Sequence, residues 1–561
     1  MLGDRRGAAA SQPTSGAPSW LVCAFAVATV VTYVCLLGHF GLAEPDEPRY
    51  AEIAREMIEL RDWVTPHLNY VKYFEKPPLI YWLTAVNFEL FGTSELVARV
   101  WPALFGLLGI VVTYSLGRSM FGQWTGCAAA ALLATTPFYF GLSQVLILDM
   151  PLAALMTVAF AAFWFARTDP RRRRAWVLLL YLVTALAVLT KGPVAVVLTA
   201  GIIFTFLLLR RELGALRWLI SPLGLVLFVV IALPWFVLVS RRNPEFVDFF
   251  VIKQHFDRFV RPDEHREPLW FFVPIVFGGM LPWSLFALPA SRMTGRFIRR
   301  LGRLRVSAAT LYCVVWSAVV FAFFSLSGSK LATYVLPLFS PLALLAARAF
   351  HSIVVGHRID LMRRGCVGLL VFAVAAAVGA AVAAEVLDQP EVGLIVPRVY
   401  AGTGMLAVSA GIALALVRRH ERMQVGFVVL LFAMLAIQIV AISARDVAVD
   451  FRSFGRAIGA QARPQDLIIS YRHYVQGILF YARRRMVMVG GRGELDFGSR
   501  QGDQRDFFWD TDEQLVAAWG SGRRVFLVIN RVELDPLLAR LRPAPRQIAA
   551  HDKKVVIVNF Q

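Results

Sequence analysis

The feature that most constrains this sequence is a succession of long apolar blocks. A helix that crosses a bilayer needs about twenty predominantly apolar residues. The chain has 561 residues, of which 58% are hydrophobic and only 17% charged, and its mean hydropathy is +0.60. These values predict a polytopic α-helical membrane protein of about 13 spans. The blocks lie at 20–41, 96–116, 124–141, 149–166, 175–190, 194–209, 218–239, 269–290, 307–326, 331–349, 366–384, 399–417 and 425–444.

The net charge of +20 is arranged as arginine clusters in short loops between these blocks. Such loops face the cytoplasm. The excess of positive charge therefore reflects the orientation of the chain in the membrane, and we expect no nucleic-acid partner. Cationic loops can also contact anionic membrane lipids. An odd number of spans places the N-terminus in the cytoplasm and the C-terminus outside. All five cysteines fall inside apolar blocks, so we expect no disulfide framework and no cysteine metal site.

Two parts are expected along the chain. Residues 1–444 form a membrane domain with two long outer loops, at 42–95 and 241–268. Residues 445–561 alternate short β-branched runs with helical patterns, which predicts a soluble α/β domain. That domain shows no catalytic motif, so we expect it to serve as a lid or stabiliser. The predicted strands lie at 467–471, 486–489, 524–530 and 554–559, and the predicted helices at 513–519 and 532–541.

The first outer loop opens with a pattern typical of a juxtamembrane helix. Pro48 can begin a helix, and apolar residues from Tyr50 onward recur at helical spacing, with charged residues on the other face. Asp46 then lies at the helix start, as either a helix cap or a catalytic carboxylate. Arg49, the neighbouring cation, is a candidate ligand for the phosphate of the lipid carrier, and Glu47 and Tyr50 are further site candidates.

The same loop contains a second short apolar helix, which two prolines introduce at 77–78. Lys76 stands before it, where backbone N–H groups and the helix dipole favour anions. A lysine there suits a phosphate, although snorkelling to the interface is the common alternative. Glu75 is another site candidate, and mixed carboxylate and histidine side chains can bind a divalent metal ion. Glu75 and His255 are therefore candidate metal ligands, against the alternative that 241–268 is a solvated loop.

Further ionisable residues lie at the outer ends of other blocks. Asp149 is a second catalytic candidate, because a carboxylate so close to hydrocarbon is costly, unless it caps the following span. Lys191 and Lys330, with Tyr334 shortly after, are either interface anchors or phosphate ligands. The cations identified in the inner loops are all arginines, which favours a phosphate role for the outer lysines.

These motifs resemble, in order over about residues 20–350, the bacterial lipid A aminoarabinose transferases. Those enzymes are C-type membrane glycosyltransferases related to the protein O-mannosyltransferases. The resemblance rests on the segments Glu44–Ala51, Tyr73–Leu79, Leu148–Pro151, Thr190–Pro193, Pro268–Trp283 and Ser329–Pro337. One departure is Gln254 before His255, where an acidic residue is expected, and it puts a metal site there in doubt.

The resemblance implies a pentosyltransferase of the periplasmic face of the inner membrane. The implied donor is undecaprenyl phosphate carrying 4-amino-4-deoxy-L-arabinose, the implied acceptor is a phosphate of lipid A or a lipopolysaccharide precursor, and the implied phenotype is resistance to polymyxin. A different sugar, a protein acceptor or a lipid-linked sugar flippase are the alternatives. Because a phosphate acceptor is already ionised, Asp46 need not be a strong base, and we expect it to orient the substrate and stabilise positive charge on the sugar. Cations such as Lys76 and Arg49 are expected to stabilise the negative charge on the leaving phosphate.

Overall fold

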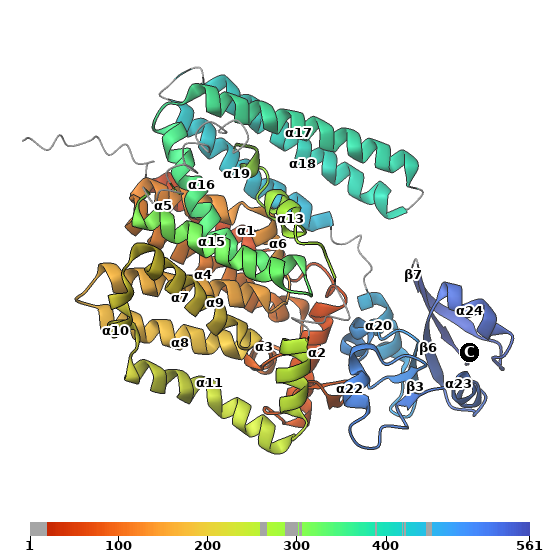
Figure 1. Ribbon diagram of the computed structural model, residues 1–561. Coiled ribbons are helices and arrows are strands. Elements are labelled where there is room, and N and C mark those ends of the chain that lie inside the picture. The colour runs from red at the N-terminus through yellow and green to blue at the C-terminus, as the bar shows by residue number, and fades with distance from the viewer. Residues whose placement is uncertain are drawn as a thin grey trace, which may run out of the picture.

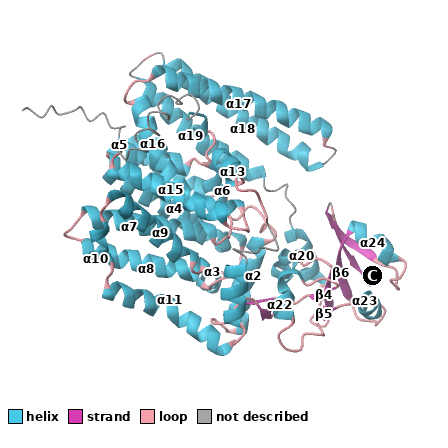
Figure 2. Ribbon diagram, in the orientation of Figure 1, coloured by secondary structure: helices cyan, strands magenta, loops and turns pink. Residues whose placement is uncertain are grey.

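The computed structural model describes residues 19–257, 266–286, 301, 306–387, 390–417, 419, 422–444, 451–551 and 553–560. A large body of packed helices lies beside a smaller mixed domain that carries the C-terminus (Figure 1). The six-stranded sheet belongs to the smaller domain, and the remaining strands form one short hairpin (Figure 2). The expected division into membrane helices and an α/β domain is therefore observed.

Nine helices within the described residues are long and apolar enough to cross a membrane, or ten if the bent pair α5 and α6 forms one span. The multi-pass prediction is confirmed. The number thirteen stays a prediction, because α1 and α9 are shorter apolar helices and the block at 269–290 extends beyond the described residues. The helices of this body are α1 (Ser19–Val34), α4 (Glu95–Phe121), α5 (Gln123–Ala134), α6 (Pro137–Ser143), α7 (Asp149–Thr168), α8 (Arg173–Lys191), α9 (Val194–Arg210), η1 (Leu213–Ala215), α10 (Leu216–Leu219), α11 (Pro222–Arg242), η2 (Asp248–Asp257), α13 (Phe272–Gly279), η3 (Trp283–Phe286), α15 (Ala308–Leu326), η4 (Ala332–Leu338), α16 (Phe339–Val354), α17 (Ile359–Val386), α18 (Pro390–Val417) and α19 (Met423–Ser443).

Burial separates central from peripheral helices. Helix α7 is the most enclosed of the nine candidate spans, since 83% of its apolar stretch is buried. The corresponding share is only 22% in α17 and in α18. These two helices lie along one edge of the body (Figure 1). Many of their exposed side chains, such as Val371 and Val378 of α17, are apolar, as expected of surfaces that face lipid. Helix α7 therefore offers a rigid support for whatever lies at its ends.

The first outer loop folds into α2 (Asp46–Leu60), a hairpin of β1 (His67–Leu68) and β2 (Val71–Lys72), and α3 (Leu79–Phe91). Two residues on the charged face of α2, Glu52 and Glu56, are fully buried. The C-terminal domain packs against α2 through α21. Burial of Glu52 is tolerated because Arg55 pairs with it at 2.6 Å.

The C-terminal domain is built on a sheet with strand order β5-β4-β3-β6-β8-β7. Strands β5, β4, β3 and β6 are parallel, and β8 and β7 are antiparallel additions. Its elements are α20 (Phe451–Gln461), β3 (Leu467–Tyr471), α21 (Gln476–Ala482), β4 (Val487–Val489), η7 (Gly493–Leu495), α22 (Asp496–Ser499), β5 (Phe508–Trp509), α23 (Asp512–Trp519), β6 (Val525–Asn530), α24 (Arg531–Leu538), β7 (Arg546–His551) and β8 (Lys554–Val558).

This domain docks on the first outer loop through specific hydrogen bonds. The side chain of Asn69, in the turn of the β1–β2 hairpin, donates to the carbonyl of Met486 at 3.0 Å and accepts from its N–H at 2.9 Å. The Glu44 carboxylate accepts a hydrogen bond from the N–H of Gly477. The segment between β3 and β4 therefore reaches the loop that carries Asp46 at two separate points.

Candidate active site

Asp46 is the first residue of α2, and its side chain does not cap that helix. The N-cap position is Pro45, without a side-chain capping bond. The Asp46 carboxylate instead pairs with Arg49, one turn later, at 3.0 Å, and its side chain is 47% exposed. The helix-cap interpretation is therefore wrong, and the carboxylate is open to a ligand.

Arg49 lies between two carboxylates from different domains. Besides Asp46 it pairs with Glu494 of η7, with 2.6 Å between Nε and the carboxylate oxygen. Both side chains are largely buried, at 13% and 14% exposed. Since two carboxylates offset one guanidinium, Arg49 is better placed to orient Asp46 than to hold a phosphate alone. No pattern in the sequence marks Glu494, because it reaches this position only through domain docking.

Buried tyrosines bring the two halves of the first loop together. Burial raises the pKa of Tyr50 well above its usual value, and the charge of Asp46 raises it further. Burial also raises the pKa of Tyr73, and the nearby charges of Glu75 and Glu494 act in the same direction. The start of α2, the segment before α3 and η7 therefore surround one polar region.

Glu44 and Glu494 border this region and hold protons more tightly than ordinary carboxyls. Burial raises the pKa of Glu44 to about 7, although the Gly477 N–H and the charge of Arg49 lower it. Burial likewise raises the pKa of Glu494, with Glu75 adding to the rise and Arg49 opposing it. The contact between the domains is therefore sensitive to protonation.

Lys76 lies beside Glu75 at the approach to α3, with 4.0 Å between the ammonium and the carboxylate. Its segment shares an apolar cluster with the end of α8, which carries Lys191. Phe74, two residues before Lys76, belongs to the same buried apolar cluster as Leu189, two residues before Lys191. The structure therefore brings these two predicted lysines toward one region.

Asp149 and Lys191 form the second charged pair. Asp149 is the first residue of α7, whose N-cap is Leu148 without a side-chain bond, so the cap interpretation is wrong here too. Its carboxylate accepts from the Lys191 ammonium at 2.5 Å. The same ammonium lies 4.5 Å from the centre of the Tyr334 ring, a cation–π contact. Asp149, Lys191 and Tyr334 are thus assembled from α7, α8 and η4.

Lys330 is 5% exposed and donates to the carbonyl of Glu267 at 2.8 Å. Arg266 and Ser329 form an isolated β-bridge beside it. A carbonyl is neutral, so this bond satisfies one ammonium hydrogen without cancelling the lysine charge. Lys330 therefore lies at the edge of the second outer loop, and its role toward phosphate stays a prediction.

The metal hypothesis stays a prediction. Within the part of the chain that the structure describes, no three His, Cys, Asp or Glu side chains lie close enough to hold a metal ion together. Glu75 pairs with Lys76. His255 belongs to η2 by its backbone, but its side chain lies outside the described residues.

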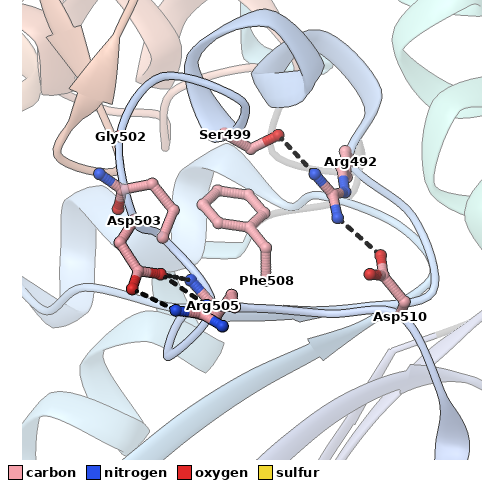
Figure 3. A pocket seen from close by; sticks show the side chains of 8 residues that line it. Arg492, Ser499, Gly502, Asp503, Arg505, Phe508 and Asp510 are labelled. Atoms are coloured by element: carbon pink, nitrogen blue, oxygen red, sulfur yellow. Dashed lines mark hydrogen bonds and ion pairs between the residues drawn. The ribbon is translucent and has the colours of Figure 1, made fainter.

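A separate hollow of about 390 Å³ opens on the C-terminal domain (Figure 3). Arg492 donates there to Ser499 at 3.2 Å and pairs with Asp510 at 2.6 Å. Its polar walls are thus already paired with one another, and none of the sequence-predicted site residues lines it.

The arrangement at the outer loops supplies two carboxylates with cations around them. Asp46 is open and oriented by Arg49, whereas Asp149 is committed to Lys191. Such an arrangement can hold anionic groups and stabilise a developing positive charge between them. Sequence reasoning missed Glu494 and Arg99. Arg99 carries a signal that could have found it, because an arginine within an apolar span is a functional candidate by default.

Comparison with known proteins places both parts of the chain. The model of the dolichyl-phosphate-mannose-protein mannosyltransferase family matches residues 18–250, and that of the aminoarabinose transferase C-terminal domain matches residues 454–559. The crystal structure of ArnT from Cupriavidus metallidurans bound to undecaprenyl phosphate is similar with a TM-score of 0.86 at 28% identity. The similarity covers 97% of this chain and 99% of that one.

Curated relatives carry one name, undecaprenyl phosphate-alpha-4-amino-4-deoxy-L-arabinose arabinosyl transferase. The protein from Aeromonas salmonicida is 30% identical over 67% of this chain and 69% of its own length. The one from Pseudomonas fluorescens is 34% identical, but the match spans only 58% of its length. The one from Pectobacterium atrosepticum is 29% identical over 94% of this chain and 95% of its own. The chain is a multi-pass membrane protein that belongs to the family of undecaprenyl phosphate-alpha-4-amino-4-deoxy-L-arabinose arabinosyl transferases.

Proposed function

We propose that this protein transfers 4-amino-4-deoxy-L-arabinose from undecaprenyl phosphate to a phosphate of lipid A. The observation that carries the proposal is the grouping of Asp46, Arg49, Glu75 and Lys76 beneath a docked C-terminal domain. The names of the relatives support the choice of sugar and carrier. The reaction takes place at the periplasmic face of the bacterial inner membrane, with the N-terminus cytoplasmic and residues 445–561 periplasmic, and its product gives resistance to cationic peptides such as polymyxin.

In the proposed reaction, an oxygen of the acceptor phosphate attacks the anomeric carbon of the sugar. The bond from that carbon to the carrier phosphate breaks, and undecaprenyl phosphate leaves with the electron pair. Direct displacement inverts the anomeric centre. Lys76, Lys191 and Lys330 stabilise phosphate charge, while Tyr334 holds the Lys191 ammonium in place.

The two carboxylates then have different tasks. Asp46, which is open, faces the substrate, orients the acceptor or the sugar amine, and stabilises the positive charge that builds on the ring. Because the acceptor phosphate is already ionised, a strong base is not required. Asp149 fixes Lys191 through its 2.5 Å contact and acts on the substrate only through that ammonium.

A transfer assay tests the proposed function directly. The purified chain in lipid vesicles receives the lipid-linked aminoarabinose and lipid A, and mass spectrometry follows the products. The expected result is lipid A heavier by one aminoarabinose residue. Unmodified lipid A alongside glycosylated protein would indicate a protein acceptor, and movement of intact donor across the bilayer without transfer would indicate a flippase.

Replacing Lys76 by Ala is expected to weaken binding of undecaprenyl phosphate about tenfold or more, since a hydrogen bond to a charged group contributes that much. Lys72→Ala is the matched control, because Lys72 lies on the same loop but pairs with Glu245 at 2.6 Å. Binding of the carrier to each variant in detergent, followed by fluorescence, is the measurement. Equal affinities for the two variants would remove Lys76 from the phosphate site.

A further inference from the structure

Arg99 is an arginine buried at the outer end of the span α4. Its side chain is 2% exposed and that of its partner Glu47 is fully buried. The guanidinium pairs with both oxygens of Glu47 at 2.8 Å. It also donates to three backbone carbonyls, those of Leu37, Phe40 and Gly41, at 2.9, 2.9 and 2.6 Å. All five N–H donors of an arginine are therefore used.

Both carboxylate oxygens of Glu47 accept two hydrogen bonds each. Besides Arg99 it accepts from the N–H of Ala43 at 2.9 Å and from the N–H of Leu146 at 2.8 Å. Burial raises the pKa of Glu47, but the charge and hydrogen bonds of Arg99 more than offset this, so the pKa is lowered and the group is ionised. We call Arg99, Glu47 and these five backbone groups the Arg99 clamp.

The Arg99 clamp joins the two turns that present the candidate carboxylates. Glu47 directly follows Asp46 at the start of α2. Leu146 lies three residues before Asp149, the first residue of α7. One side-chain pair thus fixes both turns to the end of α4, although neither Arg99 nor Glu47 pairs with Asp46 or Asp149.

We propose that Arg99 is a positioning residue, which sets the placement of the Asp46 turn relative to the Asp149 turn through Glu47. This inference rests on the proposed transferase function and extends it to a residue outside the substrate site. A buried ion pair is weak support for stability, because apolar residues of similar volume often stabilise a fold equally well. Its directional bonds are better suited to specifying one arrangement of the backbone.

The test replaces Arg99 by Lys, which keeps the charge but has three donors on a point rather than five on a planar fork. The turns before α2 and α7 then lose part of their common anchor. A misplacement of about 1 Å can cost about a hundredfold in rate, so kcat is expected to fall about a hundredfold. Affinity for undecaprenyl phosphate is expected to change by less than about threefold, because the Arg99 clamp positions the two turns and is not proposed to bind the carrier.

Arg167→Lys is the matched control. Arg167 makes a two-bond pair with Glu212 at 2.8 and 2.9 Å. It lies at the other end of α7, roughly 27 Å from Asp149 at 1.5 Å per residue. If both variants lose similar melting temperature but only Arg99→Lys loses kcat, stability does not explain the loss.

The double variant Arg99→Met with Glu47→Gln separates folding from positioning further. It leaves no buried unpaired charge, and the introduced amide retains an oxygen that can accept from the N–H of Leu146. Its melting temperature is expected to recover relative to Arg99→Met alone, while kcat stays low. Recovery of kcat in step with melting temperature, or full activity of folded Arg99→Lys, overturns the positioning role. Absence of transfer by the unaltered protein would instead count against the proposed function.

Discussion

Replacing Asp46 by Asn is expected to slow sugar transfer about a thousandfold, the upper end of the loss seen when one preorganised charge-stabilising group is removed. Asn keeps the shape of the side chain and removes its charge. The Asp46 pair with Arg49 is half-exposed on its carboxylate side, and such pairs contribute less than about 1 kcal/mol to stability. The protein should therefore fold normally and bind undecaprenyl phosphate as before, with kcat carrying the loss.

Glu59→Gln supplies the control for this experiment. Glu59 lies on the same helix, its side chain is also 47% exposed, and it also pairs with an arginine, Arg55. It lies at the opposite end of α2, away from the polar region around Tyr73. If Glu59→Gln transfers sugar normally while Asp46→Asn does not, the loss comes from the position of Asp46 and not from removing any negative charge on α2. Normal transfer by Asp46→Asn would exclude this carboxylate from the mechanism.

The sequence was most informative where a single physical requirement dominates. Every apolar block predicted as a span coincides at least in part with a helix. The four predicted strands of the C-terminal domain are all present, because a run of β-branched residues buried on both faces has few alternatives. The strand β5 at Phe508–Trp509 and the strand β7 at Arg546–His551 were not predicted. The first has only two residues, and the second lies at the edge of the sheet and contains polar residues.

The candidate site was predictable only in its local parts. The order of residues around Asp46 and Lys76 indicated two helix starts, each with a carboxylate and a cation. The partners of these residues come from elsewhere, since Arg49 pairs with Glu494 more than four hundred residues later. Docking of separate domains depends on surface complementarity, which local pattern does not encode. Asp149 and Lys191 could each be marked as unusual, but their pairing required the packing of α7 against α8.

The C-terminal domain, for which a role as lid or stabiliser was expected, contributes side chains and backbone groups to the contact with the first outer loop. It provides Glu494 to Arg49, and it places the Gly477 N–H on Glu44. It also packs against α2, where burial and the neighbouring Glu52 raise the pKa of Glu56 well above the usual value. A domain that completes the ion pairs around a site and excludes water from it strengthens the electrostatic interactions there.

Replacing Glu44 by Gln is expected to stabilise the protein at pH 8 and to leave its stability nearly unchanged at pH 4, below the unfolded-state pKa. The native pKa of Glu44 is raised from 4.5 to about 7, so the folded state binds the proton more tightly than the unfolded state. Stability therefore falls as pH rises from about 4.5 to about 7, and the loss is complete above that window. The full shift corresponds to about 3 kcal/mol, and we expect about 2 kcal/mol because Glu44 is only partly buried.

The Gln side chain keeps an oxygen that can accept from the N–H of Gly477, and it has no charge to desolvate. The melting temperature of the Glu44→Gln variant should therefore lack the fall with rising pH that Glu44 causes. The charged groups facing Glu44 are Glu494, which opposes its ionisation, and Arg49 and Lys554, which favour it. The pKa of Glu494 is also raised, so a smaller fall in melting temperature with rising pH should remain in both wild type and variant. Glu89→Gln, an exposed carboxylate on the same loop, controls for loss of a negative charge in general. The expected result is that the melting temperatures of wild type and Glu44→Gln agree at pH 4 and differ above pH 7. A constant difference between the two proteins across this range would mean that Glu44 is ionised throughout and that docking of the C-terminal domain does not depend on its proton.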